Sequence, residues 1–134
     1  QQVYYEGRKL GSEKEFAFKN ADIFAFPTYE DCFPLVLLEA MSFSKPAVTT
    51  FEGGIQDIVE DGITGFLVTQ KNAEALSDKL EILIKNTELR RQMGKSGRRK
   101  YKEEFTLNIF ENEMADILQQ VIKKNRYAAK ILHS

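Results

Sequence analysis

Two acidic side chains, Asp31 and Glu39, stand eight residues apart on either side of an expected helix start. Asp31 belongs to a polar segment, Thr28–Cys32, that is separated from the apolar run Ile23–Phe26 only by Pro27. Acids just before a helix usually act as caps or as partners of the helix dipole, and this interpretation stays open for Asp31 and Glu30. The alternative is a ligand site, because open α/β sheets bind ligands in loops beyond the carboxyl ends of their strands.

Glu39 is harder to explain by helix structure alone, because it interrupts the apolar helix expected over Pro34–Ser44. A carboxylate there either lies on a solvent stripe or is held inward, where burial without partners is costly. Asp31 near the open helix end and Glu39 on the helix flank could face one ligand. The free amides of the first turn and the helix dipole would favour a diphosphate at that end.

The elements that must position these side chains alternate between short apolar runs and amphipathic segments. The expected strands are Val3–Tyr5, Ile23–Phe26, Ala47–Thr50 and Phe66–Val68. Ile23–Phe26 lacks alternation, which is typical of a strand buried on both faces of a parallel sheet. Pro34 suits the first turn of a helix that Pro46 ends, and a short helix is expected at Gln56–Val59. These features predict an α/β fold: a partial Rossmann-like parallel sheet of about four short strands with helices on both faces.

From Asn72 onward the chain is expected to be a helical C-terminal tail. Ser12 and Glu15 have the spacing of a capping box at an earlier helix. The expected N-caps of the tail are Asn72, Thr87 and Thr106. Gly94 and Gly97 are expected to weaken or interrupt the helix that contains them. One apolar stripe is interpreted as packing surface rather than a binding groove, and consists of Phe110, Met114, Ile117 and Val121.

Length and charge exclude several functional classes. The 134 residues make one domain or a piece of one, and 19 basic against 20 acidic side chains leave a charge of -1. We therefore expect no nucleic-acid partner. The basic cluster Lys95–Lys102 is interpreted as a solvated helix face, with a membrane-surface or polyanion contact as the alternative. The single cysteine, Cys32, is consistent with a reducing compartment and with a packing or helix-entry role.

Several segments, in order, resemble the donor-site signature of the family 4 (group 1) retaining glycosyltransferases, which have the GT-B fold. A lone pair of acids at this spacing would be weak evidence, whereas several motifs in the family's order are specific. The resemblance covers nearly the whole chain. The segments are Ala21–Thr28, Asp31–Met41, Lys45–Val48, Gly53–Val59, Gly62–Val68, Arg90–Gly94 and Phe105–Leu107.

The resemblance implies that residues 1–134 are the C-terminal part of the donor-binding domain, without the N-terminal acceptor domain and the start of this domain. The parent protein would transfer a sugar from a nucleotide-diphosphate-sugar donor to a glycan, lipid or small-molecule acceptor, with retention of configuration. Asp31 and Glu39 are then the catalytic acids: Asp31 contacts the transferred sugar, and Glu39 binds the ribose hydroxyls. The residues whose backbone groups hold sugar and diphosphate are Phe33, Pro34, Leu35 and Val36. No cofactor and no metal is expected.

Two departures from the family pattern bear on the site. Asp31 stands where the family usually has glutamate, with Glu30 beside it, so either acid could contact the sugar. Pro34 stands where many members have glycine, which removes one amide donor. These departures keep an alternative function open, namely a non-catalytic sugar-nucleotide-binding or assembly module derived from a transferase.

The family's full enzyme also contains parts that this chain lacks, including the basic residues that usually neutralise the diphosphate. We therefore expect the isolated chain to be inactive. Val3–Tyr5 would lie at the far edge of the sheet, so the isolated chain could form a rearranged sheet or a homo-oligomer. A cytoplasmic location is expected. Peripheral association of the parent with the inner face of the membrane is the alternative, with acceptors reached through the N-terminal domain.

Overall fold

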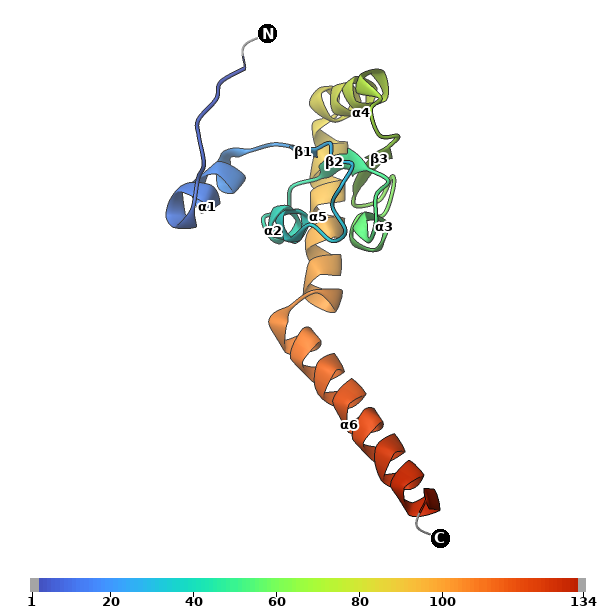
Figure 1. Ribbon diagram of the computed structural model, residues 1–134. Helices are drawn as coiled ribbons and strands as arrows, with labels where there is room; N and C mark the ends of the chain where they lie inside the picture. Colours follow the sequence, from blue (N-terminus) through green and yellow to red (C-terminus); the bar gives the residue numbers. More distant parts are fainter. Residues whose placement is uncertain (1–2, 133–134) are drawn as a thin grey trace. The chain divides into compact units, whose positions relative to one another are not determined.

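The computed structural model describes the backbone of residues 3–132 and the side chains of residues 3–124. The chain divides into two compact units, Gln1–Tyr101 and Lys102–Ser134. The first unit contains a three-stranded sheet and the helices packed on it, and the second contains the last helix (Figure 1).

The sheet is parallel and has the order β1-β2-β3. Its strands are β1 (Phe24–Phe26), β2 (Ala47–Thr50) and β3 (Gly65–Val68). The register of the β1–β2 pair places Phe24 opposite Ala47, and that of the β2–β3 pair places Ala47 opposite Gly65. Helix α2, Leu35–Ser42, connects β1 to β2, and the short helix α3, Ile55–Ile58, lies between β2 and β3. The predicted α/β fold with a parallel sheet is confirmed.

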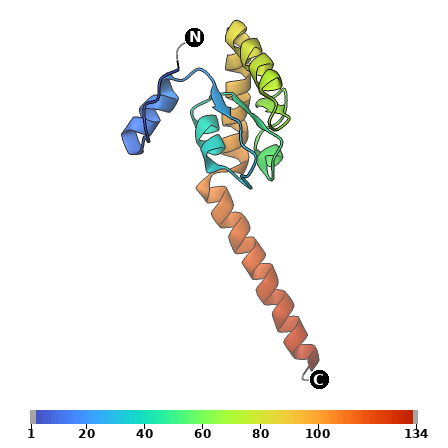
Figure 2. The same ribbon diagram turned by 45° about the horizontal axis from the view of Figure 1, so that its top comes forward.

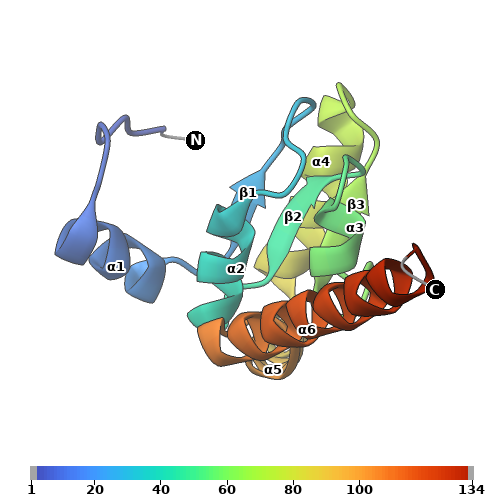
Figure 3. The same cartoon turned by 60° about the horizontal axis from the view of Figure 1, so that its bottom comes forward.

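Helices cover both faces of the sheet, as predicted. Figure 3 shows α2 and α3 in front of the strands and α4, Ala73–Lys85, behind them. On the first face Leu37 of α2 and Ile58 of α3 pack against Ala47 of β2. On the second face Leu83 of α4 packs with Val48 and Phe66. Neighbouring residues of β2 thus face opposite layers, because side chains alternate along a strand.

The β1 side of the unit differs from the prediction. Val3–Tyr5 forms no strand, and its side chains are 94%, 73% and 95% exposed, so the described sheet has three strands rather than four. An apolar run becomes a strand only when another strand accepts its backbone hydrogen bonds, and β1 pairs only with β2 among the described residues. For the same reason β1 is half-exposed rather than buried on both faces.

Helix α1, Gly11–Asn20, contacts the strands through one aromatic side chain. Phe18 is buried, and its ring centroid lies 5.5 Å from that of Phe24 and 5.5 Å from that of Phe43. The capping box predicted here is wrong. The helix already begins at Gly11, so Ser12 lies inside the first turn, and the N-cap position falls on Leu10, which makes no side-chain cap.

The later helices follow the prediction with two corrections. Asn72 caps α4 as predicted, by accepting a hydrogen bond of 2.9 Å from the Ala75 amide. The cap of α5, Thr87–Glu104, is Asn86 rather than Thr87, because the side-chain Oδ1 of Asn86 accepts from the Leu89 amide at 2.9 Å. Gly94 does not interrupt α5. A Cβ there would lie 2.0 Å from the Ser44 carbonyl oxygen, so the glycine allows a close approach of two backbones.

The basic cluster on α5 is not only a solvated face. The Arg98 guanidinium donates to the Ser42 carbonyl oxygen at 2.9 Å, and the Lys100 ammonium donates to the Asp57 carbonyl oxygen at 2.7 Å. These carbonyls lie at the C-terminal ends of α2 and α3. Such carbonyls lack intrahelical partners and carry the negative end of the helix dipole, so cations are stabilising there.

The second unit contains α6, Leu107–Leu132, which Figure 2 shows as one continuous helix. The predicted apolar stripe lies on this helix. Its four residues are each at least 41% exposed, and they are Phe110, Met114, Ile117 and Val121. None of the described helices is both long and apolar enough to cross a membrane.

Candidate functional site

The predicted site begins in the β1–α2 loop, which we define as residues Pro27–Pro34. Side chains of β2 fix the start of this loop. The Thr49 hydroxyl donates to the Phe26 carbonyl oxygen at 2.8 Å, and the Thr50 hydroxyl donates to the Thr28 carbonyl oxygen. Both threonines are buried, which explains why polar residues occupy a central strand: their hydroxyls bind backbone groups of β1 and of the loop that follows it.

The loop ends at the N-terminus of α2. Pro34 is the N-cap, with φ -74°, and no side chain caps the helix. Pro34 therefore lies one position before the first helical turn in which it was expected. The amides of Leu35 and Val36 are the first of the helix and have no intrahelical acceptor, because an α-helix leaves its first amides unpaired. They are the groups that the sequence predicted to bind an anionic ligand.

Asp31 is half-buried in this loop, whereas Glu30 is exposed. Among the described residues the Asp31 carboxylate has no hydrogen-bond or ion-pair partner. The Asp31 side chain therefore caps no helix, which leaves the two other roles named from the sequence, a partner of the α2 dipole and a ligand contact. Phe33, whose side chain is 43% exposed, lies between Asp31 and the helix start.

Glu39 lies farther along α2 and has a partner that sequence reasoning missed. Its carboxylate accepts a hydrogen bond of 2.6 Å from the Lys14 ammonium of α1, and each of the two side chains is 39% exposed. Glu39 is therefore neither on an open solvent stripe nor sealed in the core. No local pattern could have found Lys14, because the two residues are 25 positions apart.

This ion pair lines a cavity of about 320 Å³. Aromatic rings of Phe18 and Phe43 form its apolar part, and Lys14 and Glu39 supply charges of opposite sign. Its volume is at the lower end of the range for small-molecule pockets. The remaining lining residues are Gly11 and Glu15.

A second cavity, of about 250 Å³, lies where all three strands end. Thr28 and Thr69, which follow β1 and β3, line it together with Thr50, the last residue of β2. Lys71 contacts the face of the Tyr29 ring at 5.2 Å from its centroid. None of the predicted site residues lines this cavity, so it is separate from the cavity of Glu39.

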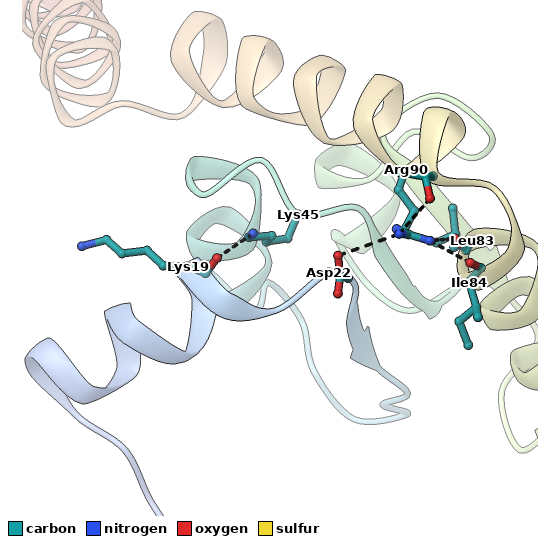
Figure 4. A network of polar contacts seen from close by, with 7 residues as sticks. Lys19, Asp22, Lys45, Leu83, Ile84 and Arg90 are labelled. Carbon is teal, nitrogen blue, oxygen red and sulfur yellow. Dashed lines mark hydrogen bonds and ion pairs between the residues drawn. The ribbon is translucent and has the colours of Figure 1, made fainter. Parts of the chain in front are cut away.

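The basic residue Arg90, in one of the motifs that carry the family resemblance, has a structural role (Figure 4). Its guanidinium donates to the carbonyl oxygens of Leu83 and Ile84, at 2.6 and 2.8 Å, where α4 ends. The same group lies 3.9 Å from the Asp22 carboxylate, just before β1. Lys45 donates nearby to the Lys19 carbonyl oxygen at 3.1 Å. These contacts lie before β1 and β2 begin, at the end of the sheet opposite the β1–α2 loop.

Comparison with known proteins identifies the family. Residues 1–100 match the model of the glycosyl transferases group 1 family. The chain therefore belongs to this family, and the α/β architecture described above is that of its GT-B members. The resemblance first seen in the ordered motifs is confirmed.

The capsular polysaccharide biosynthesis glycosyltransferase CapM of Staphylococcus aureus is 32% identical over 108 residues, which are 81% of this chain and 28% of CapM. Sucrose-phosphate synthase from Thermosynechococcus elongatus superposes with a TM-score of 0.76 at 27% identity, over 81% of this chain and 27% of that structure. The structure of Anabaena HepE in complex with UDP superposes with a TM-score of 0.77 at 22% identity, over 82% of this chain and 30% of the HepE chain. The chain thus spans less than a third of each of these relatives.

Proposed function

We propose that the full-length protein is a glycosyltransferase that moves a sugar from a nucleotide-diphosphate-sugar donor to an acceptor with retention of configuration. Family membership and the names of relatives such as CapM support the reaction class. HepE, a structural neighbour, is known in complex with UDP and with UDP-glucose, which supports a nucleotide sugar as donor. Residues 1–134 form the C-terminal part of the donor-binding domain in this proposal.

One observation carries the assignment of the site to this chain. The amides of Leu35 and Val36, which have no intrahelical acceptor, and the Asp31 carboxylate, which has no partner among the described residues, all lie around the start of α2. Amides at a helix N-terminus bind phosphate groups, because they point along the helix axis at its positive end. Asp31 would then contact the transferred sugar, and the backbone groups of Phe33 and Pro34 would contact the sugar and the diphosphate.

Glu39 would bind the ribose hydroxyls. Its Oε1 atom accepts from Lys14, and a carboxylate has room for further donors, so Lys14 and a ribose can share it. Lys14 would hold the Glu39 side chain in one orientation and lower the entropy lost on binding. The fixed positive environment of the amides stabilises the leaving nucleotide diphosphate. The acceptor attacks from the face on which this group departs, which accounts for retention.

The test is calorimetric titration of the full-length protein with UDP, GDP and ADP sugars. Replacing Glu39 by alanine removes charge-assisted hydrogen bonds to the ribose, so we expect the donor Kd to rise by about tenfold to a hundredfold. The matched control is Glu81→Ala, which removes another helical glutamate paired with a lysine, Lys85 of α4. Equal donor binding by the Glu39 and Glu81 variants would refute the assignment of Glu39.

The second candidate is a non-catalytic sugar-nucleotide-binding or assembly module, and the shorter Asp31 is the observation that favours it. Transfer activity in the full-length protein that is lost on Asp31→Ala but kept in Glu30→Ala would exclude this candidate and identify the acting acid. For the isolated chain we propose no activity and self-association through its sheet edge. Sedimentation as a monomer would contradict the self-association.

A further inference from the structure

Two adjacent glycines, Gly53 and Gly54, press against the middle of the β1–α2 loop. Gly53 has φ +43°, and a Cβ at this position would lie 2.7 Å from the Cys32 carbonyl oxygen and 2.9 Å from the Cys32 Cα. The Gly54 amide donates to the same carbonyl oxygen at 2.6 Å. The turn after β2 and the loop after β1 therefore touch backbone to backbone, 21 and 22 positions apart along the chain.

The need for glycine at the two positions has different causes. At Gly53 both the backbone conformation and the space exclude a side chain. At Gly54 φ is -81°, which any residue adopts, so only space is limiting. A Cβ at Gly54 would lie 2.8 Å from Cδ2 of the Phe33 ring and 3.1 Å from the Cys32 carbonyl oxygen. Gly54 is thus required by the contact with the loop rather than by its own turn.

The turn itself is fixed to the core. The next residue, Ile55, begins α3, and Ile55 and Ile58 are fully buried. Interiors are close-packed and resist displacement, so the glycine pair is a rigid support for Cys32 and Phe33. Those two residues lie between Asp31 and the amides of Leu35 and Val36.

We infer that the Gly53-Gly54 turn positions the β1–α2 loop, and so fixes the placement of Asp31 relative to the first amides of α2. This inference rests on the proposed function. Both glycines are positioning residues, since they act through Cys32 and Phe33 and need not touch the donor. A side chain at either position would push the loop outward and separate the group that contacts the sugar from the groups that bind the diphosphate.

The test uses Gly53→Ala and Gly54→Ala in the full-length protein, with Gly62→Ala as the matched control. Gly62 also has positive φ, +77°, but an added Cβ there meets nothing within 4 Å. Because a displaced loop weakens hydrogen bonds to a charged diphosphate, we expect the donor Kd to rise at least about tenfold for Gly53→Ala and Gly54→Ala. The control should stay within about twofold of the wild type, even if its melting temperature falls.

Two further measurements separate positioning from general destabilisation. Combining Gly54→Ala with Phe33→Ala removes the ring that the new methyl group meets. The double variant should bind the donor more tightly than the sum of the effects of the two single substitutions predicts. Hydrogen exchange of a peptide spanning residues 30–37, measured without donor, should be faster in Gly53→Ala than in Gly62→Ala.

The outcomes distinguish this inference from the proposed function. A wild type that binds no nucleotide sugar would refute the proposed function. In that case the exchange measurement still decides whether the glycines hold the loop. A wild type that binds donor, with all three glycine variants binding equally well, would overturn the positioning role. Equal exchange of the 30–37 peptide in the Gly53 and Gly62 variants would overturn it too.

Discussion

Strands β2 and β3 are buried at all four of their positions, whereas none of the three residues of β1 is fully buried. The β2–β3 side is covered by α4 and α5 through Leu83 and Met93. The β1 side is contacted by α1 through Phe18, and it also carries the predicted donor-binding groups. Stability and the candidate site are thus concentrated in different parts of the same unit. Mutations on the two sides should therefore affect different measured quantities.

The largest expected effect on stability is on the buried side. Leu83→Ala should lower the free energy of unfolding by about 3 kcal/mol, because it leaves a cavity around a fully buried side chain. The matched change on the β1 side is Leu35→Ala, at a side chain that is 67% exposed, and it should cost less than about 0.5 kcal/mol. Urea unfolding followed by circular dichroism measures both. Similar losses for the two leucines would contradict the proposed difference in stability between the two sides.

A pair of glycines in α5 tests how closely the buried side is packed. Gly94→Ala should lower the free energy of unfolding by about 2 kcal/mol, because its methyl group would collide with the Ser44 carbonyl oxygen. Gly97→Ala meets its nearest atom, Cγ of Met41, at 3.5 Å, and should be neutral or stabilising by up to about 1 kcal/mol through helix propensity. Thermal unfolding of the two variants checks the difference in sign.

The helix caps give a smaller effect. Asn86→Ala should cost about 1 kcal/mol, because the Leu89 amide loses its side-chain acceptor at the start of α5. Thr87→Ala serves as the control, since Thr87 lies inside the helix and does not supply this cap. A larger loss for Thr87→Ala than for Asn86→Ala, measured by the same urea unfolding, would show that the cap is misassigned.

The smallest effect on stability is expected on the β1 side. Lys14→Ala breaks a partly exposed ion pair and should change the free energy of unfolding by less than about 0.5 kcal/mol. The donor Kd of the full-length protein should nevertheless rise severalfold, because Glu39 loses the group that orients it. Lys85→Ala, which breaks a similar pair with Glu81, should change neither quantity. An unchanged donor Kd in Lys14→Ala would remove Lys14 from the site.

Sequence patterns predicted the parts of the fold that depend on neighbouring residues. The apolar runs of β2 and β3 and the cap at Asn72 were found, because burial pattern and capping are local signals. Val3–Tyr5 was misread, because an apolar run shows strand tendency without showing whether a partner strand is there. The capping box predicted at Ser12 does not form for a related reason: the spacing is correct, but the N-cap position lies two residues earlier, at Leu10.

The candidate site was predictable in its residues but not in its contacts. Asp31 and Glu39 were found from their types, spacing and family resemblance. Lys14 and the glycine pair were missed as partners, because the contacts Lys14–Glu39 and Gly54–Cys32 each join segments more than twenty positions apart. Such contacts depend on how the strands are ordered in the sheet, and no local spacing encodes that order.

The unpaired edge of β1 has a practical consequence. In the described sheet this strand pairs on one side only, with β2, so the backbone groups along its other edge can accept a strand from a separate polypeptide. If the full-length protein is the transferase proposed above, this edge suits fragment complementation, in which the remaining part is supplied as a second polypeptide and activity is measured after mixing. With only three residues in β1, few hydrogen bonds can form along the edge, so reassembly would be reversible and its extent would depend on concentration.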